Sequence, residues 1–176
     1  MRIESWTPSL APRNAELVAA IEARRGGTLL NLDRMLLWSE PLARGWNAYL
    51  RALRQELSLP PFLRELAICV VARLTGAEYE FHHHAPELRK AGASDAQVEA
   101  LNDPDAAATS RQFDELQRVV IRFAIASTRD VKIPDSTFDA LKQRLAPAEV
   151  VELVAVTAAY NMVARFLVAL QVTPEK

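Results

Sequence analysis

Every histidine of this sequence lies in one short stretch, LTGAEYEFHHH, which spans residues 74–84 and also holds two glutamates and a tyrosine. If the stretch is helical, Glu80 and His84 lie one turn apart on the same face, because helical residues four apart nearly eclipse. Glu78 and His82 form a second pair on a different face. A carboxyl group beside an imidazole can transfer protons without a cofactor, so we expect acid–base chemistry from the inward-facing pair.

Metal binding is one alternative for this stretch. Residues 80–83 have the form Glu-x-x-His, which di-iron helical bundles use twice. The sequence has no histidine outside residues 82–84 to make a second copy, and consecutive histidines on a helix point in different directions. We therefore expect no metal and no cofactor.

Thiol chemistry is another alternative, and it depends on one residue. Cys69 is the single cysteine and lies in the apolar run LAICVVARL. Apolar surroundings raise the pKa of a thiol and weaken it as a nucleophile. Without a second cysteine, the chain can form neither an internal disulfide nor a dithiol redox cycle. We expect Cys69 to act as a small buried hydrophobic residue.

The overall composition is that of a soluble globular protein. Half of the 176 residues are hydrophobic, and the net charge is -1, which gives no electrostatic reason to expect nucleic acid or a membrane as a partner. The first residues, MRIESWTPSLAPRN, lack the apolar core of a signal peptide. We expect one domain over residues 1–176 in the cytoplasm, acting on a small-molecule substrate.

Apolar residues recur at helical spacing along most of the chain, and no stretch alternates convincingly with the period of a strand. This predicts an all-α fold of seven to nine helices behind an extended N-terminal arm (residues 1–11). Thr75 and Glu78 have the form of a capping box for the helix that follows, and the polar residues 102–110 read as a surface loop. The helices are expected over residues 12–25, 29–38, 41–57, 62–74, 76–90, 94–101, 112–128, 134–145 and 147–170.

Several of these residues together resemble a known family. The motif runs from LRELAI (residues 63–68) through LTGAEYEF and His84 to Ala91-Gly92 and Ser94-Asp95, and NMVARF (residues 161–166) matches longer members. On these residues the chain is similar to the carboxymuconolactone decarboxylase and alkylhydroperoxidase D-like family. The resemblance implies an all-α alkylhydroperoxidase D-like multi-helix bundle that assembles into a homo-oligomer such as a dimer, trimer or hexamer.

The resemblance also implies a position for the active site. The peroxidase branch of the family uses Cys-x-x-Cys-x-x-x-His, with a glutamate twelve residues before the first cysteine. Ala77 and Glu80 stand at the two cysteine positions, His84 at the histidine and Glu65 at the upstream glutamate. Tyr79 directly precedes the second cysteine position. Because both cysteines are replaced, the thiol peroxidase cycle of the family cannot run on this motif.

These residues favour the decarboxylase side of the family, a lyase-like enzyme acting on a small carboxylate or lactone. In this hypothesis His84, oriented by Glu80 or Glu65, is the general acid–base, and Tyr79 donates a hydrogen bond to developing enolate charge. If the two glutamates lie side by side, one of them should have a raised pKa. Arg64 and Arg165 are candidates for binding a substrate carboxylate, although such arginines more often form surface or interface pairs.

Two other functions remain open on the sequence. One is the peroxiredoxin-type antioxidant activity, an oxidoreductase function, that family membership alone would suggest, here acting through Cys69. The other is a non-catalytic helical oligomer that binds a ligand or partner, with Trp38, Trp46 and Tyr49 as interface aromatics.

Overall fold

Helix α4 (Pro61–Thr75) carries an unbroken buried run in the computed structural model, which describes residues 1–175. Residues 66–72 are each at most 1% exposed, so this helix is covered on every side. A helix that is apolar all round is stable only when its neighbours enclose it. The apolar run around Cys69 therefore forms the centre of a helical core.

The described residues form ten helices and no strand, so the predicted all-α fold is confirmed. Nine helices match the predicted ones, with ends that differ by up to three residues. The additional helix is the four-residue α7, which lies within the stretch predicted as a loop; Asp103 caps it by accepting from the Ala106 amide. The other helices are α1 (Ala15–Arg25), α2 (Asn31–Leu36), α3 (Glu40–Gln55), α5 (Glu78–Lys90), α6 (Asp95–Ala100), α7 (Pro104–Ala107), α8 (Glu115–Arg129), α9 (Asp135–Lys142) and α10 (Pro147–Leu170).

The chain groups into two compact units. Unit 1 comprises residues 1–57 and the end of the chain from Ala169, and unit 2 comprises Ser58–Val168. Whether the chain acts as a single domain over residues 1–176 stays a prediction.

In unit 1, helices α1 and α2 pack against α3. Asp33 is 1% exposed and is held by Arg25 at 2.9 Å, with Arg24 beside it. The N-terminal residues form no helix, as predicted for an extended arm, but they are anchored: Trp6 is 1% exposed and its indole donates to the Ala11 carbonyl.

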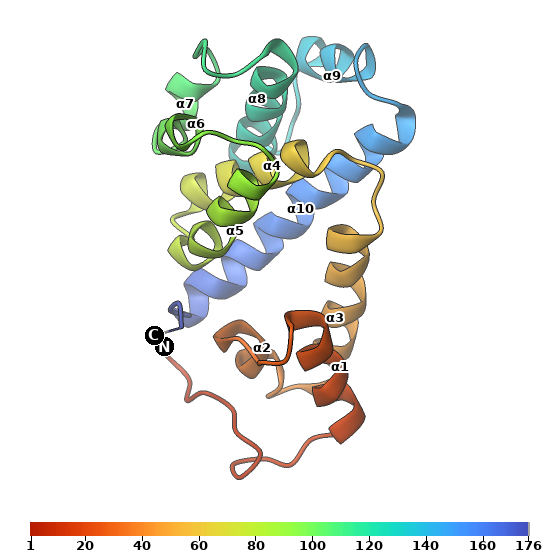
Figure 1. The fold of residues 1–176 in the computed structure, drawn as a ribbon, viewed down its shortest axis with the longest axis vertical. Helices are drawn as coiled ribbons and strands as arrows, with labels where there is room; N and C mark the ends of the chain where they lie inside the picture. The colour runs from red at the N-terminus through yellow and green to blue at the C-terminus, as the bar shows by residue number, and fades with distance from the viewer. Residues whose placement is uncertain (176) are drawn as a thin grey trace. The chain divides into compact units, whose positions relative to one another are not determined.

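In unit 2, α4 packs against both α5 and α8 (Figure 1). A short break turns the chain between α4 and α5: Gly76 adopts a left-handed conformation with φ of +66°, which suits a residue without a side chain. The predicted capping box was wrong. Thr75 is the last residue of α4 and donates back to the Val71 carbonyl, while Glu78 pairs with Arg73.

Helix α10 is the longest of the described helices, and its last two residues belong to unit 1. Of the described helices it is the one long and apolar enough to span a membrane, and half of its most apolar window is buried within the protein. The sequence left open whether this helix lies in the core or at a subunit interface. Leu153 and Ala164 are fully buried, whereas Val151 and Met162 are exposed.

The buried run of α4 predicts a clear stability contrast between two matched variants. Val70→Ala, at a fully buried position, should lower the free energy of unfolding by about 1.5–3 kcal/mol, because apolar surface is lost from the core. Val151→Ala, at a position 67% exposed, should change it by less than about 0.5 kcal/mol. Urea unfolding followed by circular dichroism measures both, and equal losses would contradict the assignment of α4 to the core.

Candidate active site

Glu65 and His84 meet in the interior of unit 2. The imidazole Nδ1 of His84 lies 2.6 Å from Oε2 of Glu65, and the two residues are 6% and 2% exposed. Glu65 comes from α4 and His84 from α5, so the packing of the two helices creates the contact. Of the two orienting partners that the sequence left open for His84, the structure brings Glu65 into hydrogen-bond contact.

The other oxygen of Glu65 is held by a cation. Arg64 Nε donates to Oε1 of Glu65 at 3.0 Å. Burial alone would raise the pKa of Glu65, but the hydrogen bond and positive charge of His84, together with Arg64, outweigh it and hold this pKa below its usual value. Glu65 is therefore an ionised carboxylate. Arg64 forms an ion pair with this carboxylate, so it is not available as predicted for binding a substrate carboxylate.

This geometry assigns the tautomer of His84. An ionised carboxylate only accepts hydrogen bonds, so Nδ1 must carry the proton that is shared with Glu65. In the neutral imidazole the lone pair then lies on Nε2, on the opposite side of the ring. An imidazole held this way can accept a proton at Nε2 while Glu65 stabilises the resulting cation.

Glu80 faces the same interior but makes no hydrogen bond. It is 2% exposed, and neither carboxyl oxygen has a hydrogen-bond partner among the described residues. Burial raises the pKa of Glu80 well above its usual value, because a buried carboxyl group without a hydrogen-bond partner favours its protonated form. The sequence predicted one carboxyl with a raised pKa from repulsion between two glutamates; the physical cause is instead burial.

The remaining residues of the stretch take different positions. Tyr79 is 5% exposed and its ring lies against His83, with ring centroids 4.5 Å apart. His82 is exposed, as is Glu78, so the predicted division of α5 into an inward pair and an outward pair is found. The structure thus brings Glu65 and His84 together, buries Glu80 one turn away on α5, and directs Tyr79 toward His83.

Cys69 lies one turn after Glu65 on α4 and is fully buried. Burial raises the pKa of its thiol, and the nearby carboxyl groups of Glu65 and Glu80 raise it further. A thiol that stays protonated is a poor nucleophile.

The sequence reasoning missed one residue of this site. Tyr160 of α10 packs against His84, with ring centroids 4.9 Å apart and ring planes at 87°. It is 2% exposed. Nothing in the spacing of α10 relates Tyr160 to a residue 76 positions earlier, so only the tertiary fold could reveal this contact.

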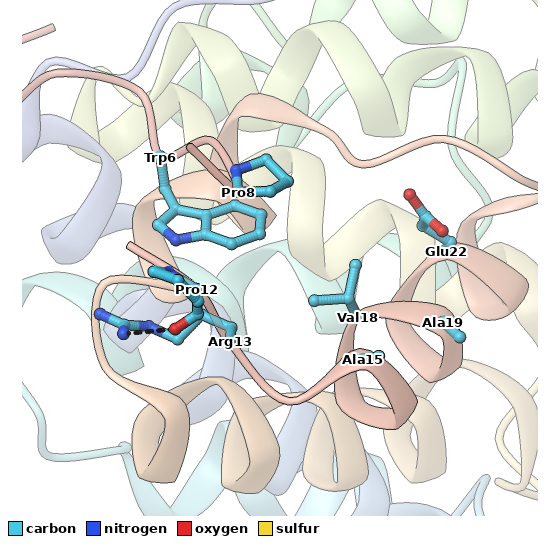
Figure 2. A pocket seen from close by; sticks show the side chains of 8 residues that line it. All are labelled: Trp6, Pro8, Pro12, Arg13, Ala15, Val18, Ala19 and Glu22. Atoms are coloured by element: carbon cyan, nitrogen blue, oxygen red, sulfur yellow. Dashed lines mark hydrogen bonds between the residues drawn. The ribbon is translucent and has the colours of Figure 1, made fainter. Parts of the chain in front are cut away.

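Two further places offer less chemistry. No group of three or more candidate metal ligands lies together among the described residues. A hollow of about 290 Å³ lies in unit 1 between the N-terminal segment and α1, lined by Trp6, two prolines and Val18 (Figure 2). Its one arginine, Arg13, donates to the carbonyls of Pro12, Leu37 and Trp38.

Comparison with known proteins identifies the segment that carries the site. Residues 40–113 match the model of the carboxymuconolactone decarboxylase family, and this range includes Glu65, Glu80 and His84. This match covers 74 of the 176 residues, so it identifies the segment as carboxymuconolactone decarboxylase-like. The family predicted from the sequence motif is therefore confirmed, and Tyr160 lies outside the carboxymuconolactone decarboxylase segment.

Solved structures share the fold over nearly the whole chain. The alkylhydroperoxidase AhpD core of an uncharacterized peroxidase-related protein from Ralstonia eutropha JMP134 aligns with a TM-score of 0.83 at 17% identity, covering 99% of this chain and 92% of that one. A peroxidase-related protein from Silicibacter sp. TM1040 aligns with a TM-score of 0.80 at 21% identity, covering 93% and 87%.

A third solved structure is the debrominase Bmp8, as a cysteine-to-alanine variant in complex with 2,3,4-tribromopyrrole. It aligns with a TM-score of 0.79 at 19% identity and covers 99% of this chain and 92% of that chain. Among curated proteins, none matches this chain. The predicted alkylhydroperoxidase D-like fold is confirmed by these likenesses.

The buried acid of Glu80 predicts a pH-dependent stability difference. The native protein holds the Glu80 proton to a higher pH than the unfolded chain, which releases it as the pH rises above the ordinary value of 4.5. Relative to Glu80→Gln, the free energy of unfolding of the wild type should fall with rising pH, by at most about 1.4 kcal/mol per pH unit. Relative to the variant, the wild type should therefore be most stable at pH 4.

Urea unfolding at several pH values between 4 and 8 measures the stability difference between the wild type and Glu80→Gln. Glu78→Gln, on the exposed face of the same helix, is the matched control and should show a nearly constant difference from the wild type. A Glu80→Gln difference that is equally constant across this range would show that Glu80 ionises normally in the folded protein.

Proposed function

We propose that this chain is a carboxymuconolactone decarboxylase-like enzyme that performs cofactor-free acid–base chemistry on a small carboxylate or lactone. The observation that carries the proposal is the buried contact of 2.6 Å between Nδ1 of His84 and the carboxylate of Glu65. An imidazole oriented by a carboxylate is a common general acid–base in enzymes.

The proposed reaction needs one proton to be delivered to carbon. When a carboxylate on the carbon next to a carbonyl group loses carbon dioxide, the electron pair of the broken carbon–carbon bond moves toward the carbonyl oxygen and forms an enolate. The enolate carbon must then be protonated. His84 would supply that proton from Nε2, with Glu65 stabilising the imidazolium before transfer.

Glu80 suits a second part of the same reaction. A protonated carboxyl group can donate a hydrogen bond to an oxygen that gains negative charge, and its strength is greatest where water is excluded. Both oxygens of Glu80 have no hydrogen-bond partner among the described residues, so a substrate oxygen would replace a missing contact. Glu80 is therefore our candidate for the enolate-binding donor; Tyr79, which the sequence predicted for this role, packs against His83.

The ligand of a solved relative supports the size of the proposed substrate. The debrominase Bmp8 was crystallised with 2,3,4-tribromopyrrole, a small ring, and it shares this fold over 99% of the present chain. We propose a small ring-containing carboxylate or lactone as substrate here, handled in the cytoplasm by a homo-oligomer.

Substitution of the two dyad residues tests the proposal. His84→Ala and Glu65→Gln should each lower turnover by about 10²–10⁴-fold, because both remove general acid–base assistance. Turnover would be followed by carbon dioxide release from a panel of carboxylated lactones. His82→Ala, on the exposed face of the same helix, should retain wild-type rates. Wild-type turnover in both dyad variants would refute the acid–base role.

Peroxide reduction through Cys69 is the competing function, because two of the solved relatives are peroxidase-related. The burial of Cys69 and the raised pKa of its thiol argue against it. In the folded protein Cys69 should resist a thiol-specific reagent at pH 8, and Cys69→Ser should leave lactone turnover within about twofold of the wild type, because a buried thiol takes no part in the reaction. Peroxide-dependent oxidation of Cys69, read by intact-mass spectrometry, would favour the peroxidase instead.

The non-catalytic alternative makes the opposite prediction for the dyad variants. Trp46 is buried, while Trp38 and Tyr49 are exposed, so two of the three aromatics proposed for an interface are accessible. A ligand-binding protein without activity would bind the lactone panel and release no carbon dioxide, with or without His84.

A further inference from the structure

Tyr160 touches the dyad from a part of the chain outside the matched family segment. Its ring meets the His84 ring nearly at right angles, with centroids 4.9 Å apart, and both residues are almost fully buried. Glu65 approaches His84 from α4 and Tyr160 from α10. His84 is therefore contacted by two helices other than its own.

We infer that Tyr160 is a positioning residue that fixes the plane of the His84 imidazole and so the direction in which Nε2 points. This inference rests on the proposed function, in which Nε2 delivers the proton.

The imidazole of His84 is contacted both by Glu65 and by Tyr160. Glu65 contacts it at Nδ1, 2.6 Å away, and the ring of Tyr160 packs against it with the ring centroids 4.9 Å apart. The side-chain torsion that sets the ring plane of a histidine has broad, roughly two-fold preferences, so contacts with neighbouring groups help to set this plane. A perpendicular aromatic contact depends on the angle between the two rings, so it restrains the imidazole plane in addition to the Glu65 contact.

The position of Tyr160 is itself held in place. The next residue, Asn161, donates from Nδ2 to Thr128 Oγ1 of α8 at 3.0 Å and to the Thr157 carbonyl. The Asn161 side-chain oxygen accepts from Arg165 at 3.0 Å. This stretch of α10 is thereby tied to α8, and the ring of Tyr160 presents a fixed surface to His84.

Positioning matters here because proton transfer depends steeply on geometry. A displacement of about 1 Å in a reacting group can cost about 10²-fold in rate. If Tyr160 fixes Nε2, its loss should reduce kcat while substrate binding through other groups is retained, so KM should change little.

The test compares Tyr160→Leu, Tyr160→Phe and a control variant by nitrogen-15 and proton NMR of the histidine rings and by kinetics. The sequence has three histidines, and the signals of His84 are assigned by their loss in His84→Ala. Tyr160→Leu should broaden the Nδ1 proton signal of His84 and shift its pH titration. It should also lower kcat by about 10–100-fold with KM within about twofold. Tyr160→Phe restores the aromatic ring and should rescue the NMR signal.

The matched control is Leu153→Ala, at a fully buried position on the same helix. It should destabilise the fold and leave the His84 signals unchanged. Wild-type His84 signals in Tyr160→Leu, or an equal change in Leu153→Ala, would overturn the inference. The NMR measurement decides on Tyr160 even where the proposed function fails, because that failure appears separately as unaltered turnover in His84→Ala.

Discussion

The buried hydrogen bond between Glu65 and His84 is the interaction on which the proposed chemistry depends. A carboxylate in a protein interior is costly unless it is paired, and Glu65 is paired twice, with His84 and with Arg64. The apolar run of α4 excludes water from this pair and strengthens it. The same low-polarity surroundings raise the pKa values of the Glu80 carboxyl and the Cys69 thiol, so one environment favours a charged Glu65 beside two neighbouring acids in their protonated forms.

Helical spacing on α5 was sufficient to divide Glu78, Glu80, His82 and His84 into pairs on two faces, and the structure shows which face is buried. Glu80 and His84 are buried and Glu78 and His82 are exposed, as the four-residue period requires. The sequence did not decide which of the two glutamates, Glu65 or Glu80, orients His84. They lie on different helices, so the choice depends on how those helices pack. Glu65 entered the prediction through its place in a family motif, and the structure supplied the contact.

Other features lay beyond what local sequence could predict. Tyr160 reaches the site through tertiary packing, and the orphaned oxygens of Glu80 are visible only once its surroundings are known. The misplaced capping box has a local cause: Thr75 and Glu78 have the right spacing, but a threonine hydroxyl can equally donate to a carbonyl one turn back, and here it donates to Val71.

The number of residues in the short break around Gly76 determines which way the side chains of α5 point relative to α4. Gly76 ends α4 in a left-handed turn, Ala77 caps α5, and α5 begins at Glu78, so two residues separate the helices. Successive residues of a helix are rotated by about 100°, so one inserted residue ahead of α5 would carry His84 away from Glu65 unless the turn absorbed it. The number of residues between Glu65 and His84 is therefore as much a determinant of the dyad as their identities, and relatives that keep both residues at a different spacing should not be assumed to keep the same site.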